Sequence, residues 1–452
     1  MILKFVDREK ELEELEKRHG SGKPELIIMY GRRRVGKTEI IKKFIDGKTG
    51  LYFLAKQEDM DIEFNRFKEK LASKLNIFLG GRSWEELFNE VADKTKGRLI
   101  IVIDEFPYWI IEDGRITSEI QYVWDEILSK KNIMLVLLGS YVSIMEQKVL
   151  GHKTPLYGRR TSQMEIKPLG IKCLKEFFPR YDARCAIEAY GALGTIPYYL
   201  NQFDDAKDFW QNVRDTFLNT SNILYADAEI LLSAEVREYN KYFNVMKSII
   251  GGAVKLNEIA NAAKIDITNV PKYLKVLAGL KLIRRAKPVT SNFREKHYIY
   301  EIDDNYFRFW LSFVYPYRDE IETDPEAALS AIKSRYSDYM GKIFEGFVER
   351  SLRNITGMEF SSVGRWWHKD KEIDVVGIND AKKEIFFVEC KWQDGVDASR
   401  ILDELEKKAE GVEWNKGKRA EKYAVFARSF SRRSKKHLCF DLNDIEKALW
   451  GK

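Results

Sequence analysis

The chain has 452 residues, of which 44% are hydrophobic, and its formal net charge is +6. This length favours about three domains with cores of their own, and this charge permits a nucleic-acid partner without requiring one. The four cysteines form no CxxC pair, no apolar run reaches the roughly 20 residues that span a bilayer, and the charged N-terminal segment is unlike a signal peptide. We therefore expect a cytoplasmic protein without a disulfide framework, a zinc site or a membrane segment.

The first 165 residues alternate between strand and helix patterns, which predicts an α/β fold. The runs at 99–103 and 134–138 consist of Ile, Val, Leu and Met, as in central strands of a parallel sheet that is covered on both faces. We predict strands at 26–30, 51–54, 99–103 and 134–138, and helices at 9–19, 38–44, 64–75 and 84–95.

A phosphate-binding pattern lies between the first predicted strand and the helix that follows it. Gly31-Arg-Arg-Arg-Val-Gly36-Lys37-Thr38 fits GxxxxGK[ST], the P-loop. The glycines allow a tight turn whose N–H groups point at phosphate oxygens, and the helix adds its positive N-terminal end. Lys37 would bind the β- and γ-phosphates, and Thr38 would bind Mg²⁺. The sequence therefore predicts ATP binding with Mg²⁺.

Polar residues follow the next two central strands. Asp104 and Glu105 end one apolar strand, so Asp104 is expected to hold Mg²⁺ and Glu105 to act as the general base on water. Ser140 ends the next strand and would contact the γ-phosphate, or is an ordinary strand-end serine. Arg159 and Arg160 would stabilise the transition state in cis or in trans, or form a solvated surface pair.

Several of these motifs together resemble the archaeal ATPase family, in the AAA+ and STAND-like branch of P-loop proteins. The resemblance rests on Phe5-Val-Asp-Arg-Glu-x-Glu-Leu, the P-loop, Asp104-Glu105-Phe106, Gly139-Ser140, Leu156-Tyr-Gly-Arg-Arg-Thr161 and Gly194-Thr-Ile-Pro197-Tyr-Tyr-Leu200. It implies that Phe5, Val6 and Arg8 lie near the adenine and that Pro197 lies near the nucleotide. It also implies a helical lid after the ATPase core.

The middle of the chain has a helical pattern that ends in a predicted hairpin at 281–287 and 296–302. Two short helices, at 256–263 and 267–277, precede Gly279 and a strand, an order that resembles a winged helix-turn-helix. Such a module would bind DNA, or would contact another protein. The exposed face of the second helix would carry Asn269, Lys272, Tyr273 and Lys275, and the wing Arg284, Arg285, Lys287, Arg294 and Lys296.

A third set of polar residues follows an acidic spacer at 319–325 and a helix at 336–354. Asp374 lies on a strand predicted at 372–378, and Glu389 and Lys391 lie on one face of the next strand. Paired strands would place the two carboxylates together as Mg²⁺ ligands, Glu345 could join them, and Lys391 could orient water.

These residues resemble the PD-(D/E)xK nuclease superfamily. The resemblance implies metal-dependent cleavage of nucleic acid, or an inactive nuclease-like domain that only binds it. The basic run at 428–437 would grip a phosphate backbone or would be a solvated segment.

The predicted architecture is therefore a multidomain α/β protein. Its parts are a P-loop ATPase core (1–165), a helical lid (166–235), a winged helix-turn-helix (236–316) and a restriction-endonuclease-like α/β domain (317–452). ATP hydrolysis would control DNA binding and cleavage. The alternatives are a nucleotide-operated signalling switch without cutting, and a DNA-binding regulator with ATP as an allosteric ligand.

Overall fold

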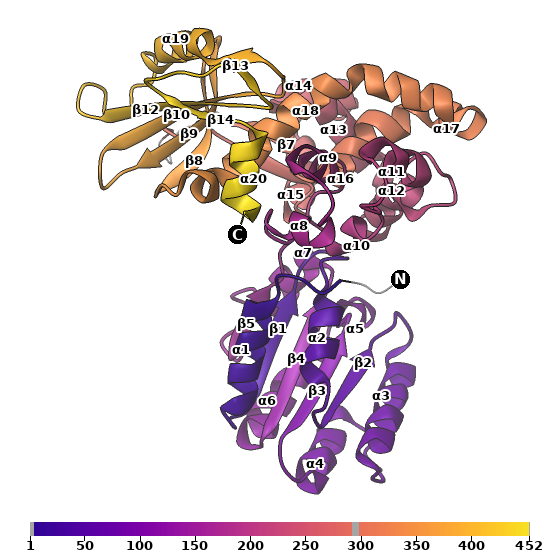
Figure 1. Ribbon diagram of the computed structural model, residues 1–452. Helices are drawn as coiled ribbons and strands as arrows, with labels where there is room; N and C mark the ends of the chain where they lie inside the picture. Colours follow the sequence, from indigo (N-terminus) through magenta and orange to yellow (C-terminus); the bar gives the residue numbers. More distant parts are fainter. Residues whose placement is uncertain (1–3, 292–297, 452) are drawn as a thin grey trace. The chain divides into compact units, whose positions relative to one another are not determined.

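The computed structural model describes residues 4–291 and 298–451. The chain forms two compact units, one of Met1–Leu169 with Ile196–Tyr198, and one of Gly170–Thr195 with Tyr199–Lys452 (Figure 1). The finer division at 235 and 316 stays a prediction. In the described part of the chain, no helix is long and apolar enough to cross a membrane.

The first unit is built on a five-stranded parallel sheet in the order β2-β3-β4-β1-β5. Because all five strands run the same way, the residues that follow β1, β3 and β4 emerge at one edge of the sheet. These are the P-loop, Glu105 and Ser140. The strands are β1 (Glu25–Tyr30), β2 (Gly50–Leu54), β3 (Leu99–Asp104), β4 (Ile133–Gly139) and β5 (Ser162–Glu165).

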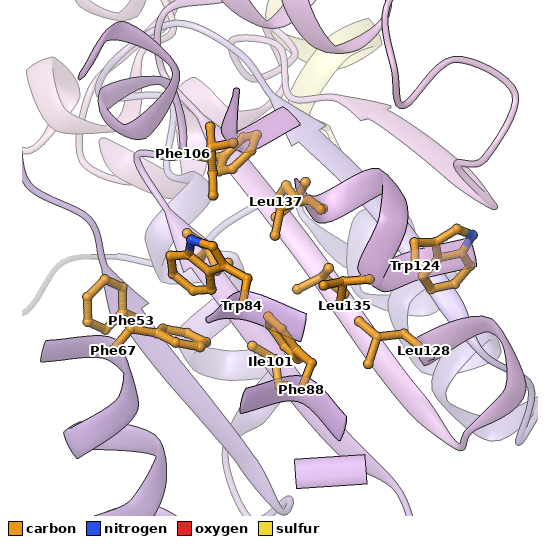
Figure 2. Close-up of a cluster of buried hydrophobic side chains, with 14 of the residues drawn as sticks. Phe53, Phe67, Trp84, Phe88, Ile101, Phe106, Trp124, Leu128, Leu135 and Leu137 are labelled. Atoms are coloured by element: carbon orange, nitrogen blue, oxygen red, sulfur yellow. The ribbon is translucent and has the colours of Figure 1, made fainter. Parts of the chain in front are cut away.

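Helices cover both faces of this sheet, as the apolar central strands predict. Alternate residues of β1 belong to different cores: Ile27 packs in the one with α1 and α2, and Ile28 in the one with α3, α4 and α6. Figure 2 shows the second core, where Phe53 and Phe67 meet edge to face at 5.2 Å between ring centroids. The helices are α1 (Glu9–Gly20), α2 (Lys37–Ile45), α3 (Met60–Leu75), α4 (Trp84–Lys94), α5 (Pro107–Glu112), α6 (Ile116–Glu126) and α7 (Val142–Ile144).

The second unit begins with short helices, as its sequence pattern predicts. Its hairpin pairs β6 (Ile283–Ala286) with β7 (Ile299–Ile302) in antiparallel register. Before this hairpin the chain forms α8 (Cys173–Phe177), α9 (Ala183–Leu193), α10 (Pro197–Leu200), α11 (Phe209–Thr216), α12 (Ile223–Glu235), α13 (Tyr239–Ile250), α14 (Leu256–Ala263) and α15 (Val270–Gly279). Of these helices, α10 has residues in both units.

The segment predicted as an acidic spacer is helical, so that prediction is wrong. After α16 (Asn305–Phe309), the chain forms α17 (Arg318–Thr323) and then α18 (Pro325–Thr356), which starts eleven residues before the predicted helix at 336. The side chain of Asp324 accepts hydrogen bonds from the N–H groups of Glu326 and Ala327. Asp followed by Pro is therefore a helix start here, with a capping side chain and a fixed φ, and not a linker.

The C-terminal part of this unit contains a five-stranded mixed sheet in the order β14-β12-β10-β9-β8. Strands β9 and β10 are paired, in antiparallel direction, and β10 pairs parallel with β12. Helix α19 packs on one core of this sheet, and α18 also contacts β8, β9 and β10. The elements are β8 (Ser362–His368), β9 (Lys371–Asn379), β10 (Glu384–Lys391), β11 (Val396–Asp397), α19 (Ala398–Ala409), β12 (Ala420–Ala427), β13 (Phe430–Arg432), β14 (Leu438–Phe440) and α20 (Leu442–Trp450).

Strand β9 has an irregularity at the acidic residue that the sequence singles out. Val376 pairs with Gly364 and Ile373 with Trp366, so three steps on β9 face two steps on β8. The extra residue falls at Asp374 and Val375. Such a bulge bends the strand and turns a side chain out of the regular alternation, and bulges are common beside functional sites.

Candidate functional site

The P-loop joins β1 to α2 in a conformation that its glycines permit. A Cβ atom on Gly31 would collide with the carbonyl oxygen of Ile166 on the neighbouring chain segment. Gly36 has a φ of 95° and immediately precedes α2, so the chain turns sharply into the helix. The Lys37 ammonium donates hydrogen bonds to the carbonyl oxygens of Gly31 at 2.7 Å and Arg32 at 2.9 Å. The lysine thus lies against the loop whose N–H groups would receive phosphate.

Three side chains from different elements meet beside the P-loop. The Thr38 hydroxyl donates to Asp104 Oδ2 at 2.8 Å, and the Tyr52 hydroxyl donates to the same oxygen at 2.6 Å. Burial, followed by the hydrogen bond to Asp104, raises the pKa of Tyr52, so the phenol stays protonated and remains a donor. The buried Asp104 carboxylate and the threonine hydroxyl are hard oxygen donors, which fit Mg²⁺.

The predicted base and the predicted phosphate-sensing residue are in direct contact. Ser140 Oγ donates to Glu105 Oε1 at 2.7 Å, and the Ser140 N–H donates to Glu105 Oε2 at 3.4 Å. Glu105 has a φ of 56°, a left-handed conformation that is uncommon outside glycine. Strained backbone of this kind occurs at functional sites, where surrounding contacts hold it in place. Here the bond to Ser140 fixes the carboxylate at the P-loop edge of the sheet.

The N-terminal segment and residues 196–198 also lie in this first unit. Arg8 is buried and donates through Nη2 to the carbonyl oxygens of Val35 and Lys167, each at 2.8 Å. Arg8 thus ties the N-terminal segment to the P-loop. The structure places Phe5 over α2, where the Lys43 ammonium lies 4.1 Å from the ring centroid.

Pro197 belongs to the short segment Ile196–Tyr198, which groups with the first unit. In that segment, the Tyr198 ring lies 4.4 Å from the guanidinium carbon of Arg34, a P-loop residue. This contact brings residues of the predicted lid motif to the P-loop, although a role of Pro197 in nucleotide binding stays a prediction.

Arg159 and Arg160 directly precede Thr161, whose backbone lies beside the start of β1. Arg159 Nε donates to both carboxylate oxygens of Asp125, at 2.8 and 2.7 Å, near the C-terminal end of α6. Thr161 directly follows Arg160, and its N–H donates to the carbonyl of Leu26, the second residue of β1. The P-loop follows the last residue of β1. The pairing with Asp125 gives Arg159 a structural partner, and a catalytic role of Arg159 or Arg160, in cis or in trans, stays a prediction.

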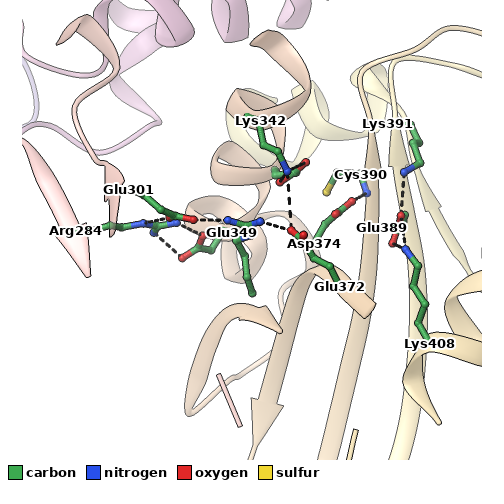
Figure 3. Close-up of polar contacts among 12 residues, drawn as sticks. Arg284, Glu301, Lys342, Glu349, Glu372, Asp374, Glu389, Cys390, Lys391 and Lys408 are labelled. Carbon is green, nitrogen blue, oxygen red and sulfur yellow. Dashed lines mark hydrogen bonds and ion pairs between the residues drawn. The ribbon is translucent and has the colours of Figure 1, made fainter. Parts of the chain in front are cut away.

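A second group of charged residues lies in the C-terminal sheet (Figure 3). Asp374 is buried and accepts a 2.8 Å hydrogen bond from the Cys390 N–H. Burial, then the charges of Glu345 and Glu389, raise the pKa of Asp374 to about 7. Glu389 accepts from Lys391 at 2.9 Å. The predicted acid, acid and lysine therefore come together on β9 and β10.

Glu345 joins this group from α18, and the structure adds a residue that was not predicted as a ligand. Carboxylate oxygens of Glu345, Glu372 and Asp374 all lie within 4.8 Å of one another. Burial raises the pKa of Glu345. Glu389 also accepts from Lys408 at 3.0 and 3.1 Å, so two lysines balance its charge. The sequence signal for Glu372 was present in Glu-Ile-Asp, but strand alternation alone did not show that α18 faces both acids.

A chain of ion pairs runs from the hairpin to these acids. Arg284 on β6 donates to Glu301 at 2.9 Å and to both oxygens of Glu349, each at 2.9 Å. Arg365 on β8 bonds both Glu301 and Glu372. Arg284 was predicted as a phosphate contact of a wing, but its guanidinium is committed to two carboxylates of its own unit. The prediction of a phosphate contact is therefore wrong. The sequence does not reveal these partners, because they lie far from Arg284 in the chain.

Of the other residues that are predicted to face DNA, one is buried and five are exposed among those that the structure describes. Tyr273 is buried with 3% of its surface exposed, so its prediction as a surface residue is wrong. The Tyr242 ring packs edge to face against it at 4.9 Å. Arg294 and Lys296 lie outside the described residues. Exposed positions are Asn269, Lys272, Lys275, Arg285 and Lys287.

The basic run at 428–437 is largely paired with acids of its own unit. Arg433 bonds Asp441, and His437 lies 2.9 Å from a carboxylate oxygen of Glu406. Arg428 bonds Asp394 in the same manner. These contacts favour a structural role for the run over a phosphate-gripping one.

Comparison with known proteins gives two family matches. Residues 5–203 match the ATPase domain found predominantly in Archaea, and residues 310–409 match archaeal and bacterial proteins of unknown function. The uncharacterized protein MJECL04 of Methanocaldococcus jannaschii is 34% identical over 449 residues, which cover 98% of this chain and 100% of that protein. The uncharacterized ATP-binding protein MJ0423 of the same organism is 57% identical over 47 residues, 10% of this chain and 80% of that protein.

A solved structure shows a related fold. The Walker-type ATPase PABY2304 of Pyrococcus abyssi superposes with a TM-score of 0.51 at 22% identity. The superposition covers 68% of this chain and 96% of that one. At this identity the likeness is one of fold.

Proposed function

The chain belongs to the archaeal ATPase family that includes MJECL04, and on that premise we propose that it hydrolyses ATP at the site formed by the P-loop, Asp104 and Glu105. In this proposal, P-loop N–H groups and Lys37 bind the phosphates. Thr38 and Asp104 would hold Mg²⁺, which supplies positive charge to the phosphate oxygens when bound.

Glu105 is the general base of the proposed reaction. Its carboxylate accepts a proton from the attacking water, and Ser140 keeps that carboxylate oriented through the 2.7 Å hydrogen bond. The observation that carries the proposal is this contact between the ends of β3 and β4, at the same sheet edge as the P-loop. A carboxylate that served only as a surface acid would not need a buried serine and a left-handed backbone to hold it.

Phosphate release from ATP tests the proposal. We expect Lys37→Ala to lower the rate of release at saturating Mg²⁺ by at least about 100-fold, since one charge on the transferring phosphate is lost. Lys42→Ala is the matched control, because Lys42 lies on the same helix, is exposed and pairs only with Glu39 among the contacts described. Equal rates of phosphate release for the Lys37 variant and wild type would contradict the assignment of this site.

A second activity is supported by the C-terminal acids. We propose that Glu345, Glu372, Asp374 and Glu389 hold a divalent cation and that the unit cleaves nucleic acid. Carboxylate oxygens suit Mg²⁺ or Mn²⁺, which would supply Lewis-acid chemistry at a phosphate. Lys391 would orient a water molecule from beside Glu389. The raised pKa of Asp374 supports this, because buried acids forced together are common at functional sites.

Incubation with several DNA and RNA forms, in Mg²⁺ or Mn²⁺ and with ATP, tests the nuclease proposal. We expect cleavage by wild type and none by Asp374→Ala. Intact nucleic acid in every condition would leave the alternative, a nucleotide-operated switch without cutting. DNA binding through the exposed lysines of α15 belongs to the same proposal, and a loss of affinity with rising salt supports it.

A further inference from the structure

Arg33 lies in the middle of the P-loop, and its side chain reaches the strand ends that carry Glu105 and Ser140. Its Nη2 donates to the Tyr141 hydroxyl at 2.8 Å and to the Tyr108 hydroxyl at 3.4 Å. Tyr141 directly follows Ser140, and Tyr108 follows Glu105 by three residues. The guanidinium therefore lies over the same part of the sheet edge as the proposed base.

Two aromatic rings hold this guanidinium. The rings of Tyr108 and Tyr141 meet edge to face at 5.8 Å, and the Arg33 guanidinium carbon lies 4.9 Å from the Tyr141 centroid. All three side chains are half-buried. A cation in such surroundings is less screened by water than a surface arginine, so its charge acts more strongly on a nearby anion.

Phosphoryl transfer needs positive charge where the γ-phosphate separates from the leaving diphosphate. The guanidinium of Arg159, one of two arginines predicted for this role, is held by Asp125 near the C-terminal end of α6. Arg33 lies at the correct edge. A guanidinium has five N–H donors, so a contact with a tyrosine hydroxyl is compatible with a second contact to a phosphate oxygen.

We propose that Arg33 is a catalytic residue of the ATP hydrolysis proposed above, on which this inference rests. Water attacks the γ-phosphorus, and its proton passes to Glu105. The bond from that phosphorus to the oxygen bridging it to the β-phosphate breaks, and ADP and phosphate leave. Arg33 stays protonated throughout and contacts a γ-phosphate oxygen, where it stabilises the developing charge. Tyr108 and Tyr141 position it.

Steady-state kinetics of Arg33→Ala, Arg33→Gln and Arg33→Lys test this role. We expect the alanine and glutamine variants to bind ADP within about 3-fold of wild type and to lose about 100-fold or more in kcat. The lysine variant should have a kcat between those of wild type and the alanine variant, because it retains the charge but not the planar fork. Arg115→Ala is the control, since Arg115 is highly exposed and pairs only with Asp113 among the described contacts.

Two further measurements separate catalysis from folding. Wild type should bind ADP with aluminium fluoride, a mimic of the transferring phosphoryl group, more tightly than ADP alone, and Arg33→Ala and Arg33→Gln should lose that gain. Guanidinium ion at millimolar concentration should raise the rate of Arg33→Ala and leave Arg115→Ala unchanged. If the alanine variant does not fold, the glutamine variant decides by the same readouts.

The outcomes distinguish a failure of the role of Arg33 from a failure of the proposed ATP hydrolysis, on which that role rests. If wild type hydrolyses ATP and the neutral variants retain kcat within about 3-fold, Arg33 has no catalytic role and the inference falls alone. If wild type releases no phosphate from ATP, the proposed hydrolysis fails and this inference fails with it.

Discussion

Ser140 donates a 2.7 Å hydrogen bond from its side chain to the carboxylate of Glu105, which lies 35 residues earlier in the chain, and so links the ends of two strands. The two strands, β3 and β4, are neighbours in the parallel sheet. The contact holds the proposed base still, and its loss should affect catalysis more than nucleotide binding.

Ser140→Ala should lower kcat by about 10-fold, since one hydrogen bond to a charged group contributes roughly 1.5 kcal/mol and 1.4 kcal/mol corresponds to a factor of ten. Affinity for ADP should stay within about 2-fold, because ADP lacks the γ-phosphate that the base faces. Ser129→Ala serves as the control, as its hydroxyl is exposed and bonds the carbonyl of Asp125, away from Glu105. A variant with normal kcat and weakened ADP binding would contradict the positioning role.

Gly31→Ala should abolish nucleotide binding, because its Cβ would collide with the carbonyl oxygen of Ile166 and displace the loop. Equilibrium binding of a fluorescent ADP analogue checks this. Gly22→Ala is a control in the same unit, where a Cβ meets nothing within 4 Å although φ is 66°. Retained binding in the Gly31 variant would show that the loop does not need this close approach.

Asp374→Asn should stabilise the second unit in a pH-dependent way. The folded pKa of Asp374, about 7, lies above its ordinary value of 3.8. Its carboxyl therefore contributes stability that is present below the unfolded pKa and is lost as pH rises toward 7. The gain from the asparagine variant should be on the order of 2–3 kcal/mol larger at pH 8 than at pH 5.

Urea unfolding of wild type and variant at both pH values, without divalent cations, measures this difference. Asp380→Asn is the control, since Asp380 is an exposed aspartate near the end of the same strand. A gain that is the same at pH 5 and pH 8 would mean that Asp374 has an ordinary pKa.

Arg284→Ala should destabilise the second unit by about 2–4 kcal/mol, because Glu301 and Glu349 are left as mostly buried carboxylates with one cation fewer. Chemical denaturation followed by tryptophan fluorescence measures the effect. Arg400→Ala, which removes an exposed arginine paired with Glu404 at 3.7 Å, should cost less than about 0.5 kcal/mol. Equal effects of the two substitutions would show that the ion-pair chain does not stabilise the fold.

Local patterns were sufficient to predict that the P-loop, Asp104, Glu105 and Ser140 lie at one edge of a parallel sheet. Apolar runs ending in Asp104-Glu105 and in Ser140 indicate parallel strands, and parallel strands bring their carboxyl ends to one edge. The same reasoning could not find Arg33, because the variable positions of the P-loop pattern say nothing of Tyr108 and Tyr141. That contact depends on loops that fold toward each other from separate strands.

The C-terminal site was predictable only within its strands. Period-two alternation placed Glu389 and Lys391 on one face, but Glu372 joins Asp374 and Glu345 through a bulge and a helix from far upstream. Charge pairing was also hidden from sequence. Arg284, Arg428 and Arg433 pair with acids that local sequence patterns do not reveal, so the sequence alone favours a nucleic-acid partner for them.

Single-turnover conversion of bound ATP is the most direct test of the central proposal, that Glu105 activates water at this P-loop. Enzyme in excess is mixed with ATP and Mg²⁺, and the bound nucleotide is identified over time. Wild type should convert ATP to ADP, whereas Glu105→Gln should bind ATP within about 3-fold of wild type and convert it at least about 100-fold more slowly. Conversion at the wild-type rate by the glutamine variant would contradict the account.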